Sequence, residues 1–246
     1  NPMNAVPTIK KSNYLAKQNK EVLPVCETIT VFTDEEIEKF KAEAYKKYPS
    51  GKPKHYQASA YILMLNTGLR TAEALGLINS DIDLEKKVMH IQRGVKEAQK
   101  RDGTERKSGR EIVVGKLKTA SSKRIVPLNE TAIQAIIELR NERYFGEDAP
   151  LIPDADGNFT RPLNLRKRFY SILDAAGIEK KGLHSLRHTF ATKLVTGVRA
   201  EDGTVKALTP RQVADLLGHT TSEITEMYYV KRNTDMLMGV TNGFEL

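Results

Sequence analysis

Cysteine is nearly absent from this sequence, and long apolar runs are missing altogether. Cys26 is the only cysteine among the 246 residues, so the chain cannot form an internal disulfide or a cysteine-rich metal site. Such sparse use of cysteine is typical of a reducing compartment, and we expect a cytoplasmic location. No apolar stretch approaches the roughly 20 residues of a membrane span, and none resembles a signal-peptide core. We therefore predict a protein without disulfides or membrane spans.

Negative charge is also in deficit. The sequence contains 39 Lys and Arg residues against 31 Asp and Glu residues, which gives a net charge of +8 and an isoelectric point of about 9.4. This excess indicates a polyanionic partner, most often nucleic acid or an anionic membrane surface. The content of 39% hydrophobic and 28% charged residues is that of a soluble globular protein. The length suffices for one large domain or two modest ones.

The first part of the chain differs from the rest. Residues 1–29 contain three prolines and a pair of lysines but no sustained apolar period, which predicts a linker. Because the sequence begins with Asn1 and Pro2, we expect this linker to be the end of a truncated upstream domain. Residues 30–246 are predicted to form one folded domain with a C-terminal tail. No internal repeat is present.

The domain is predicted to be mainly α with a small antiparallel β-sheet, an α+β fold. Apolar periodicity and capping signals predict helices that begin near Thr33, Thr131 and Thr209, and others over residues 56–65, 69–75, 161–176 and 184–194. Short β-branched runs predict strands over residues 88–91, 112–114 and 124–128. Residues 96–110 are polar, basic and contain glycine, so we expect a long mobile loop there.

One stretch, residues 184–192, combines packing with chemistry. His184 and Arg187 are three residues apart, so on a helix they leave neighbouring points of one face. Leu186, Phe190 and Leu194 recur at the four-residue spacing of a different, buried face. An imidazole transfers protons near neutral pH, and a guanidinium binds phosphate or carboxylate oxygens. The stretch therefore predicts a packed helix that presents both groups at one surface.

Four further residues extend this set. Arg70 follows a glycine-containing turn, Lys118 lies in a turn between strands, His219 follows a helix-ending glycine, and Tyr228 comes nine residues later. The two arginines can neutralise the oxygens of a phosphodiester in its transition state, and the lysine can protonate a leaving alkoxide. A tyrosine is a weak nucleophile at its free pKa near 10 and needs a neighbouring base or cations. This set predicts phosphoryl transfer without a metal.

The same residues carry a family resemblance. In order along the chain, the motifs are Thr67-Gly68-Leu69-Arg70-x-x-Glu73-x-x-x-Leu77, Lys118-Thr119 with Ser121, Arg124, Pro127 and Leu128, His184-x-x-Arg187, Leu216-Leu217-Gly218-His219 and Tyr228. Over residues 30–232 they strongly resemble the tyrosine recombinase (phage integrase) family. The resemblance implies that family's catalytic-domain fold and a site-specific recombinase or integrase acting on double-stranded DNA.

The resemblance also implies a division of labour. Tyr228 would attack the scissile phosphate, form a 3′-phosphotyrosyl intermediate and free a 5′-hydroxyl, while Lys118 protonates the leaving 5′ oxygen. Arg70 and Arg187 would clamp the phosphate. His184 would assist proton transfer at the tyrosine, and His219 would hydrogen-bond to the phosphate. No metal, ATP or other cofactor is implied, in agreement with the lack of a P-loop or clustered carboxylates.

Assembly is likewise implied by the family. Its members work as homotetramers on two duplexes and often pass a C-terminal segment to a neighbour. Residues 236–240 form an apolar patch that fits such an exchange or packs on its own domain. The long basic insertion at residues 96–110 favours a mobile-element or phage integrase over the alternative, a Xer-type chromosome or plasmid resolvase. We expect the upstream domain that completes a clamp around DNA to lie outside this sequence, and we therefore expect weak independent site recognition.

Several positions have competing interpretations. A zincin motif would use His184 and His188, but it needs Glu directly after the first histidine, where Ser185 stands. We therefore predict a packing or hydrogen-bonding role for His188. Glu73 is predicted to be a structural partner of basic groups rather than a catalytic acid. Residues 194–209 form a longer loop than the family pattern, which would change local DNA or subunit contacts.

Two assigned residues have rivals close by. Lys116 and Lys123 flank Lys118, which the family spacing favours. Tyr229 directly follows Tyr228, and the spacing from His219 favours Tyr228.

Two other functions remain open. A non-catalytic DNA-binding module would explain the charge but not the tyrosine set, and a hydrolytic phosphodiesterase would normally show metal-binding carboxylates or form no covalent adduct.

Overall fold

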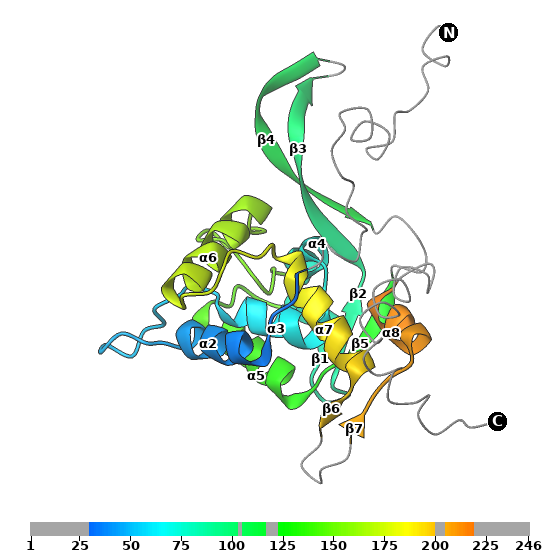
Figure 1. The fold of residues 1–246 in the computed structure, drawn as a ribbon. Helices are drawn as coiled ribbons and strands as arrows, with labels where there is room; N and C mark the ends of the chain where they lie inside the picture. Colours follow the sequence, from blue (N-terminus) through cyan, green and yellow to red (C-terminus); the bar gives the residue numbers. More distant parts are fainter. Residues whose placement is uncertain (1–29, 103–104, 117–122, 200–204, 219–246) are drawn as a thin grey trace, which may run out of the picture.

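The structure, a computed structural model, describes residues 30–102, 105–116, 123–199 and 205–218 (Figure 1). Its helices are α2 (Asp34–Ala44), α3 (Ser59–Thr67), α4 (Thr71–Gly76), the 3-10 turn η3 (Asn79–Asp81), α5 (Glu130–Glu142), α6 (Pro162–Ala175), α7 (His184–Thr196) and α8 (Pro210–Leu217). Its strands are β1 (Ile82–Asp83), β2 (Val88–Ile91), β3 (Arg93–Asp102), β4 (Glu105–Lys116), β5 (Arg124–Pro127), β6 (Val198–Arg199) and β7 (Val205–Lys206). None of the described helices is long and apolar enough to cross a membrane. The predicted linker 1–29 and the tail patch 236–240 lie outside these ranges.

Capping signals in the sequence were reliable guides to helix starts. The Thr33 side chain accepts a hydrogen bond from the Glu36 N–H, and a Glu36 carboxylate oxygen accepts one from the Thr33 N–H, so α2 begins as predicted. Thr209 and Gln212 form the same capping box at the start of α8. These bonds satisfy backbone N–H groups that a helix start leaves unpaired. Gly218 then ends α8 in the left-handed conformation, also as predicted.

The start of α3 was predicted three residues too early. The expected helix over residues 56–65 begins only at Ser59, because Gln57 has φ of 57° and breaks the helical path. Both carboxylate oxygens of Glu142 lie 3.0 Å from the Gln57 backbone nitrogen and accept its hydrogen bond. The Gln57 side chain also donates to the Pro153 carbonyl oxygen. These contacts with distant residues stabilise a conformation that local propensity disfavours.

A three-stranded antiparallel sheet has the strand order β1-β2-β5. Met89 of β2 pairs with Val126 of β5, and both side chains are buried, as is Ile91. The strands predicted over residues 88–91 and 124–128 are therefore confirmed. The described residues also form two two-stranded sheets, β3-β4 and β6-β7, and the predicted α+β class is correct.

The predicted mobile loop at residues 96–110 was also wrong. This segment belongs to the β3-β4 hairpin, a long ribbon that projects from the rest of the domain (Figure 1). Val95 pairs with Val114 and Glu97 with Ile112 across the ribbon. Cross-strand hydrogen bonds join the two strands, and the backbone groups on the outer edges can bond to water, so the sequence beyond buried Val95 can stay polar. The Glu97 carboxylate lies 3.8 Å from guanidinium nitrogens of Arg110 and Arg161, which ties the ribbon to the start of α6.

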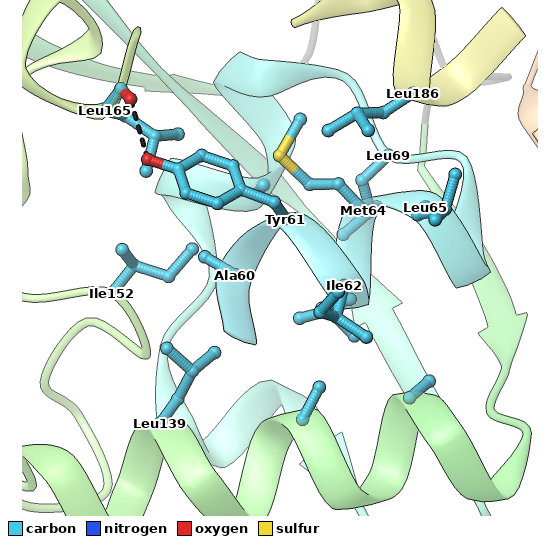
Figure 2. Close-up of a cluster of buried hydrophobic side chains, with 14 of the residues drawn as sticks. Ala60, Tyr61, Ile62, Met64, Leu65, Leu69, Leu139, Ile152, Leu165 and Leu186 are labelled. Carbon is cyan, nitrogen blue, oxygen red and sulfur yellow. Dashed lines mark hydrogen bonds between the residues drawn. The ribbon is translucent and has the colours of Figure 1, made fainter. Parts of the chain in front are cut away.

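Helix α3 lies at the centre of the main hydrophobic core. Every residue from Ala60 to Met64 is almost completely buried, as the apolar run predicted. Figure 2 shows Tyr61 pointing toward Leu165, whose carbonyl oxygen accepts a 2.7 Å hydrogen bond from the phenol. Phe169 packs on the Tyr61 ring with a centroid distance of 5.2 Å. This core fixes the position of α7, because Leu186 of that helix packs into it (Figure 2).

A second, small cluster joins α7 to α8. Ala191, Val213 and Leu217 are buried there, and Phe190 and Leu194 pack against them while half-buried. The predicted apolar face of α7 is thus divided, since Leu186 belongs to the main core.

The chain segment before α2 is bonded directly to α7. The Phe32 backbone N–H donates a buried 2.8 Å hydrogen bond to the Thr189 hydroxyl oxygen, and that hydroxyl donates to the Ser185 carbonyl oxygen. The Phe32 ring packs against Phe40 and Phe169. Phe32 therefore completes the core and holds α7 by its backbone.

Candidate functional site

Arg187 lies at the junction of three helices. Its side chain is only 2% exposed, and its two terminal nitrogens donate to the Gly68 carbonyl oxygen at 2.7 Å and the Leu217 carbonyl oxygen at 2.8 Å. Burial and the nearby charge of Arg70 lower the pKa of Arg187 to about 9, so the guanidinium stays charged at neutral pH. Arg187 therefore joins α7 to the turn that precedes α4 and to the end of α8.

Arg70 is the more accessible of the two arginines. It is the N-cap residue of α4, and its backbone N–H donates to a Glu73 carboxylate oxygen at 2.9 Å. Its guanidinium donates to the other carboxylate oxygen at 2.7 Å and to the Gly218 carbonyl oxygen at 3.4 Å. The side chain remains 36% exposed. A cation oriented by a carboxylate and open to solvent is suited to binding an anion.

Glu73 forms ion pairs with three arginines of the site. Its side chain is 2% exposed, and both its oxygens accept hydrogen bonds of 3.0 Å from the Arg124 guanidinium. A nitrogen of Arg187 lies 4.0 Å from one of them. Burial alone would raise the pKa of Glu73, but the hydrogen bonds from Arg124 and Arg70 outweigh it and lower the pKa to about 2. The prediction that Glu73 is a structural partner of basic groups is confirmed.

Arg124 is the residue of this network that sequence reasoning missed. It appeared only as one position of a family motif, yet its side chain is 7% exposed and bonds two distant elements. Besides gripping Glu73, it donates from Nε to the Leu216 carbonyl oxygen at 2.9 Å. A usable signal was its place at the head of a short strand that carries buried Val126, because an arginine that packs beside the core needs a carboxylate partner.

His184 and His188 form a ring pair on α7. Their centroids are 4.6 Å apart and the ring planes are nearly perpendicular, at 89°. Burial is the main cause that lowers the pKa of both imidazoles, followed for His184 by the charges of Arg187 and Arg70. Both rings are thus neutral at pH 7, and a neutral imidazole can accept a proton. Among the described residues no group of three His, Cys, Asp or Glu side chains could hold a metal ion.

The lowered pKa values predict an acid-sensitive stability. An unfolded histidine has a pKa near 6.5, whereas the pKa of folded His188 is about 4. Between these values the unfolded chain binds more protons, so the free energy of unfolding falls as the pH falls from 6.5 to 4. We expect a loss of about 2 kcal/mol between pH 7 and pH 5 from this group. Urea denaturation at both pH values measures it, and a His188→Phe chain that loses as much as the unchanged chain would contradict it.

Gly68 permits the close approach of the site's elements. Its φ is 63°, and an added Cβ would lie 2.5 Å from a ring carbon of Phe190 and 2.6 Å from a methyl of Leu217. A Gly68→Ala chain combines left-handed strain with overpacking, so we expect it to be less stable by about 2 to 4 kcal/mol. Gly177 is the matched control, because its φ is 65° and its Cβ would meet open space.

Denaturant unfolding separates the two causes. Gly177→Ala carries the backbone strain alone and should cost about 1 kcal/mol. Equal losses in the two variants would show that the contacts at Gly68 are unimportant.

The structure brings three of the six predicted site residues together. Arg70 and Arg187 share Glu73, and the charges of both arginines act on His184. Three others, Lys118, His219 and Tyr228, lie outside the described residues, as does Tyr229. The described chain leads to two of them: β4 ends at Lys116 and β5 begins at Arg124, and α8 ends directly before Gly218.

Residues 30–235 of the chain match the sequence model of the phage integrase family. The chain belongs to this family. The resemblance drawn from the motifs is thereby confirmed. Membership of the phage integrase family also accounts for the arrangement found, since the motif residues Arg70, Glu73, Arg124 and Arg187 form one bonded network.

Individual relatives agree with the family. A tyrosine recombinase XerC-like protein of Caldanaerobacter subterraneus subsp. tengcongensis is 31% identical over 233 residues, which cover 88% of this chain and 56% of that protein. The transposase from transposon Tn916 of Enterococcus faecalis is 26% identical over 230 residues, covering 85% and 49%. The chain spans about half the length of the curated relatives it matches.

A solved structure shows the fold. The Tn1549 transposon integrase in complex with circular intermediate DNA aligns with a TM-score of 0.66 at 20% identity, over 93% of this chain and 74% of that one. The predicted α+β fold of the phage integrase family is therefore confirmed.

Proposed function

We propose that this phage integrase family member is a site-specific DNA recombinase that cleaves and rejoins strands through a 3′-phosphotyrosyl intermediate. The observation that carries this proposal is the arginine pair: buried Arg187 and half-exposed Arg70 are held by one buried carboxylate, Glu73. Because these cations are oriented before any anion binds, they can stabilise charge that builds on a phosphate without reorganising.

The proposed cleavage step is a transesterification. The Tyr228 phenol oxygen bonds to phosphorus as the bond from phosphorus to the 5′ oxygen breaks. The phenol proton passes to neutral His184, and Lys118 donates a proton to the leaving 5′ oxygen. Arg70 and Arg187 bind the non-bridging oxygens of the phosphate. His219 donates a further hydrogen bond to the same phosphate. One phosphodiester replaces another, so rejoining needs no ATP and no cofactor.

Mobile-element or phage integration is the biological role we favour. A relative is named as the transposase from transposon Tn916, and the ordered β3-β4 hairpin is a long basic insertion in the domain. The Xer-type alternative has the support of the XerC-like relative. For either role we propose double-stranded DNA as the substrate, a homotetramer on two duplexes with exchange of the tail at residues 236–240, and a cytoplasmic location. Residues 1–29 would then link an upstream DNA-binding domain to the catalytic domain 30–246.

A nicked suicide substrate tests the proposed chemistry. Duplexes selected from random DNA by binding to the chain would be nicked near the cleavage position, so that a short fragment diffuses away and traps any covalent intermediate. We expect a protein–DNA adduct that survives denaturing gel electrophoresis and maps by peptide analysis to a tyrosine. Binding without an adduct would instead identify a DNA-binding module, and cut product without an adduct would identify a hydrolase.

A further inference from the structure

His188 is in contact with a proposed catalytic group but has no role of its own in the proposed step. It lies one helical turn after His184, and the edge of one imidazole points at the face of the other across 4.6 Å. Residues four apart on a helix are direct neighbours, so the two rings restrict each other's rotation. His188 is itself half-buried. His184 is exposed, so the contact with His188 restricts one side of an otherwise accessible imidazole.

The charges around the pair are mostly positive. Arg187 lies on the same helix, and the charges of Arg70 and Glu73, at the start of α4, act on His184. Helix α3, which packs against α7, contains no charged residue. On α8 the two charged residues, Arg211 and Asp215, form an exposed ion pair of 3.4 Å with each other.

Two imidazolium ions cannot persist side by side in these surroundings. Like charges this close repel strongly in a partly buried site, and the guanidinium of Arg187 adds to the repulsion. His188 is the more buried of the two rings, and its pKa falls to about 4, first through burial and then through the charge of His184. His188 therefore stays neutral while His184 gains and loses a proton.

We propose that His188 is a positioning residue, whose neutral ring holds the His184 imidazole in the orientation that accepts the Tyr228 proton. The inference rests on the proposed function for the proton's source, but the ring contact itself does not depend on DNA. By shielding one side of His184 from water, His188 also keeps that imidazole unprotonated and ready to act as a base.

Two substitutions separate ring packing from other effects. His188→Ala removes the ring and admits water, whereas His188→Phe keeps a flat ring that cannot be protonated. His55→Ala is the matched control, since His55 is a partly buried histidine that contacts Glu43, away from α7. All three chains would be compared with the unchanged chain at a pH where each is folded.

The first measurement is the titration of His184 by NMR in the absence of DNA. We expect the pKa of His184 to rise toward the free value in His188→Ala, because burial is the main cause that lowers it. It should stay unchanged in His188→Phe and in His55→Ala. An unchanged titration in His188→Ala would overturn the inference, whether or not the chain cleaves DNA.

The second measurement is the single-turnover rate of adduct formation against pH. We expect His188→Ala to be slower by about tenfold to a hundredfold, a part of what general base catalysis contributes. The acid limb of its profile should move to higher pH. His188→Phe should keep the unchanged profile within about threefold in rate, by the same reasoning. A His188→Phe chain as slow as His188→Ala would contradict ring positioning, whereas absence of any adduct in the unchanged chain would count against the proposed function alone.

Discussion

A chain carrying Tyr228→Phe is expected to form no covalent adduct with DNA, although it binds the same DNA as the unchanged chain. The substitution removes only the phenol oxygen, which is the proposed nucleophile, and keeps the ring. No neighbouring group can replace it without changing the position of attack on phosphorus. Denaturing electrophoresis of the suicide-substrate reaction measures the adduct, and a mobility-shift titration measures binding.

The control is the neighbouring tyrosine. The spacing from His219 favours Tyr228 over its neighbour Tyr229 as the nucleophile. We expect Tyr229→Phe to form the adduct at close to the unchanged yield. An adduct that persists in Tyr228→Phe and disappears in Tyr229→Phe would show that the nucleophile had been assigned to the wrong tyrosine.

Glu73→Ala is expected to be the most destabilising substitution in the domain's described site. It removes the carboxylate that Arg124 and Arg70 bind and that lies 4.0 Å from a nitrogen of buried Arg187. Removing one partner of a buried ion pair costs about 3 to 5 kcal/mol, because the remaining charge stays buried without compensation. Urea denaturation at pH 7 should show this loss, and adduct formation should fall with it as Arg70 loses its orientation.

An exposed ion pair is the matched control. The Glu130 and Lys87 side chains form a surface pair with 79% and 56% exposure. Pairs of this kind contribute about 0 to 1 kcal/mol, so Glu130→Ala should be almost as stable as the unchanged chain. A Glu73→Ala chain that unfolds as Glu130→Ala does would show that the arginines are held by other contacts.

The lowered pKa of Glu73 makes the free energy of unfolding fall in acid. Its pKa falls from 4.5 when unfolded to about 2 when folded. The stability that it contributes is therefore complete above about pH 4.5 and is lost as the pH falls toward 2. This window lies below that of His188, so the two groups can be distinguished in one acid titration.

Local chemistry made much of the fold readable from the sequence. The capping boxes at Thr33 and Thr209 involve residues only three positions apart, and both helices begin where predicted. The helix over residues 184–194 and the strand over residues 88–91 also followed from their apolar periods. By contrast, Gln57 is held by Glu142, 85 positions away, and no local pattern reports such a bond.

The candidate site was predicted from motifs rather than from local helix and strand signals. Arg70, His184 and Arg187 were identified by motifs, and the structure places all three within one electrostatic environment. Arg124 was undervalued, because its importance arises from a carboxylate 51 positions away. Of the β3-β4 hairpin only the strand over residues 112–114 was predicted, because cross-strand pairing stabilises its polar residues, although Val95 is buried in the main core.

The bond between Phe32 and Thr189 decides where a minimal independent fragment can begin. A chain shortened to start at Thr33 would lose a core ring that packs on Phe169, and would leave the Thr189 hydroxyl oxygen without its donor. Sequence patterns alone would suggest the capping box as a natural boundary. Expression of the domain by itself should therefore keep the residues upstream of α2, because part of the support of α7 enters the domain from there.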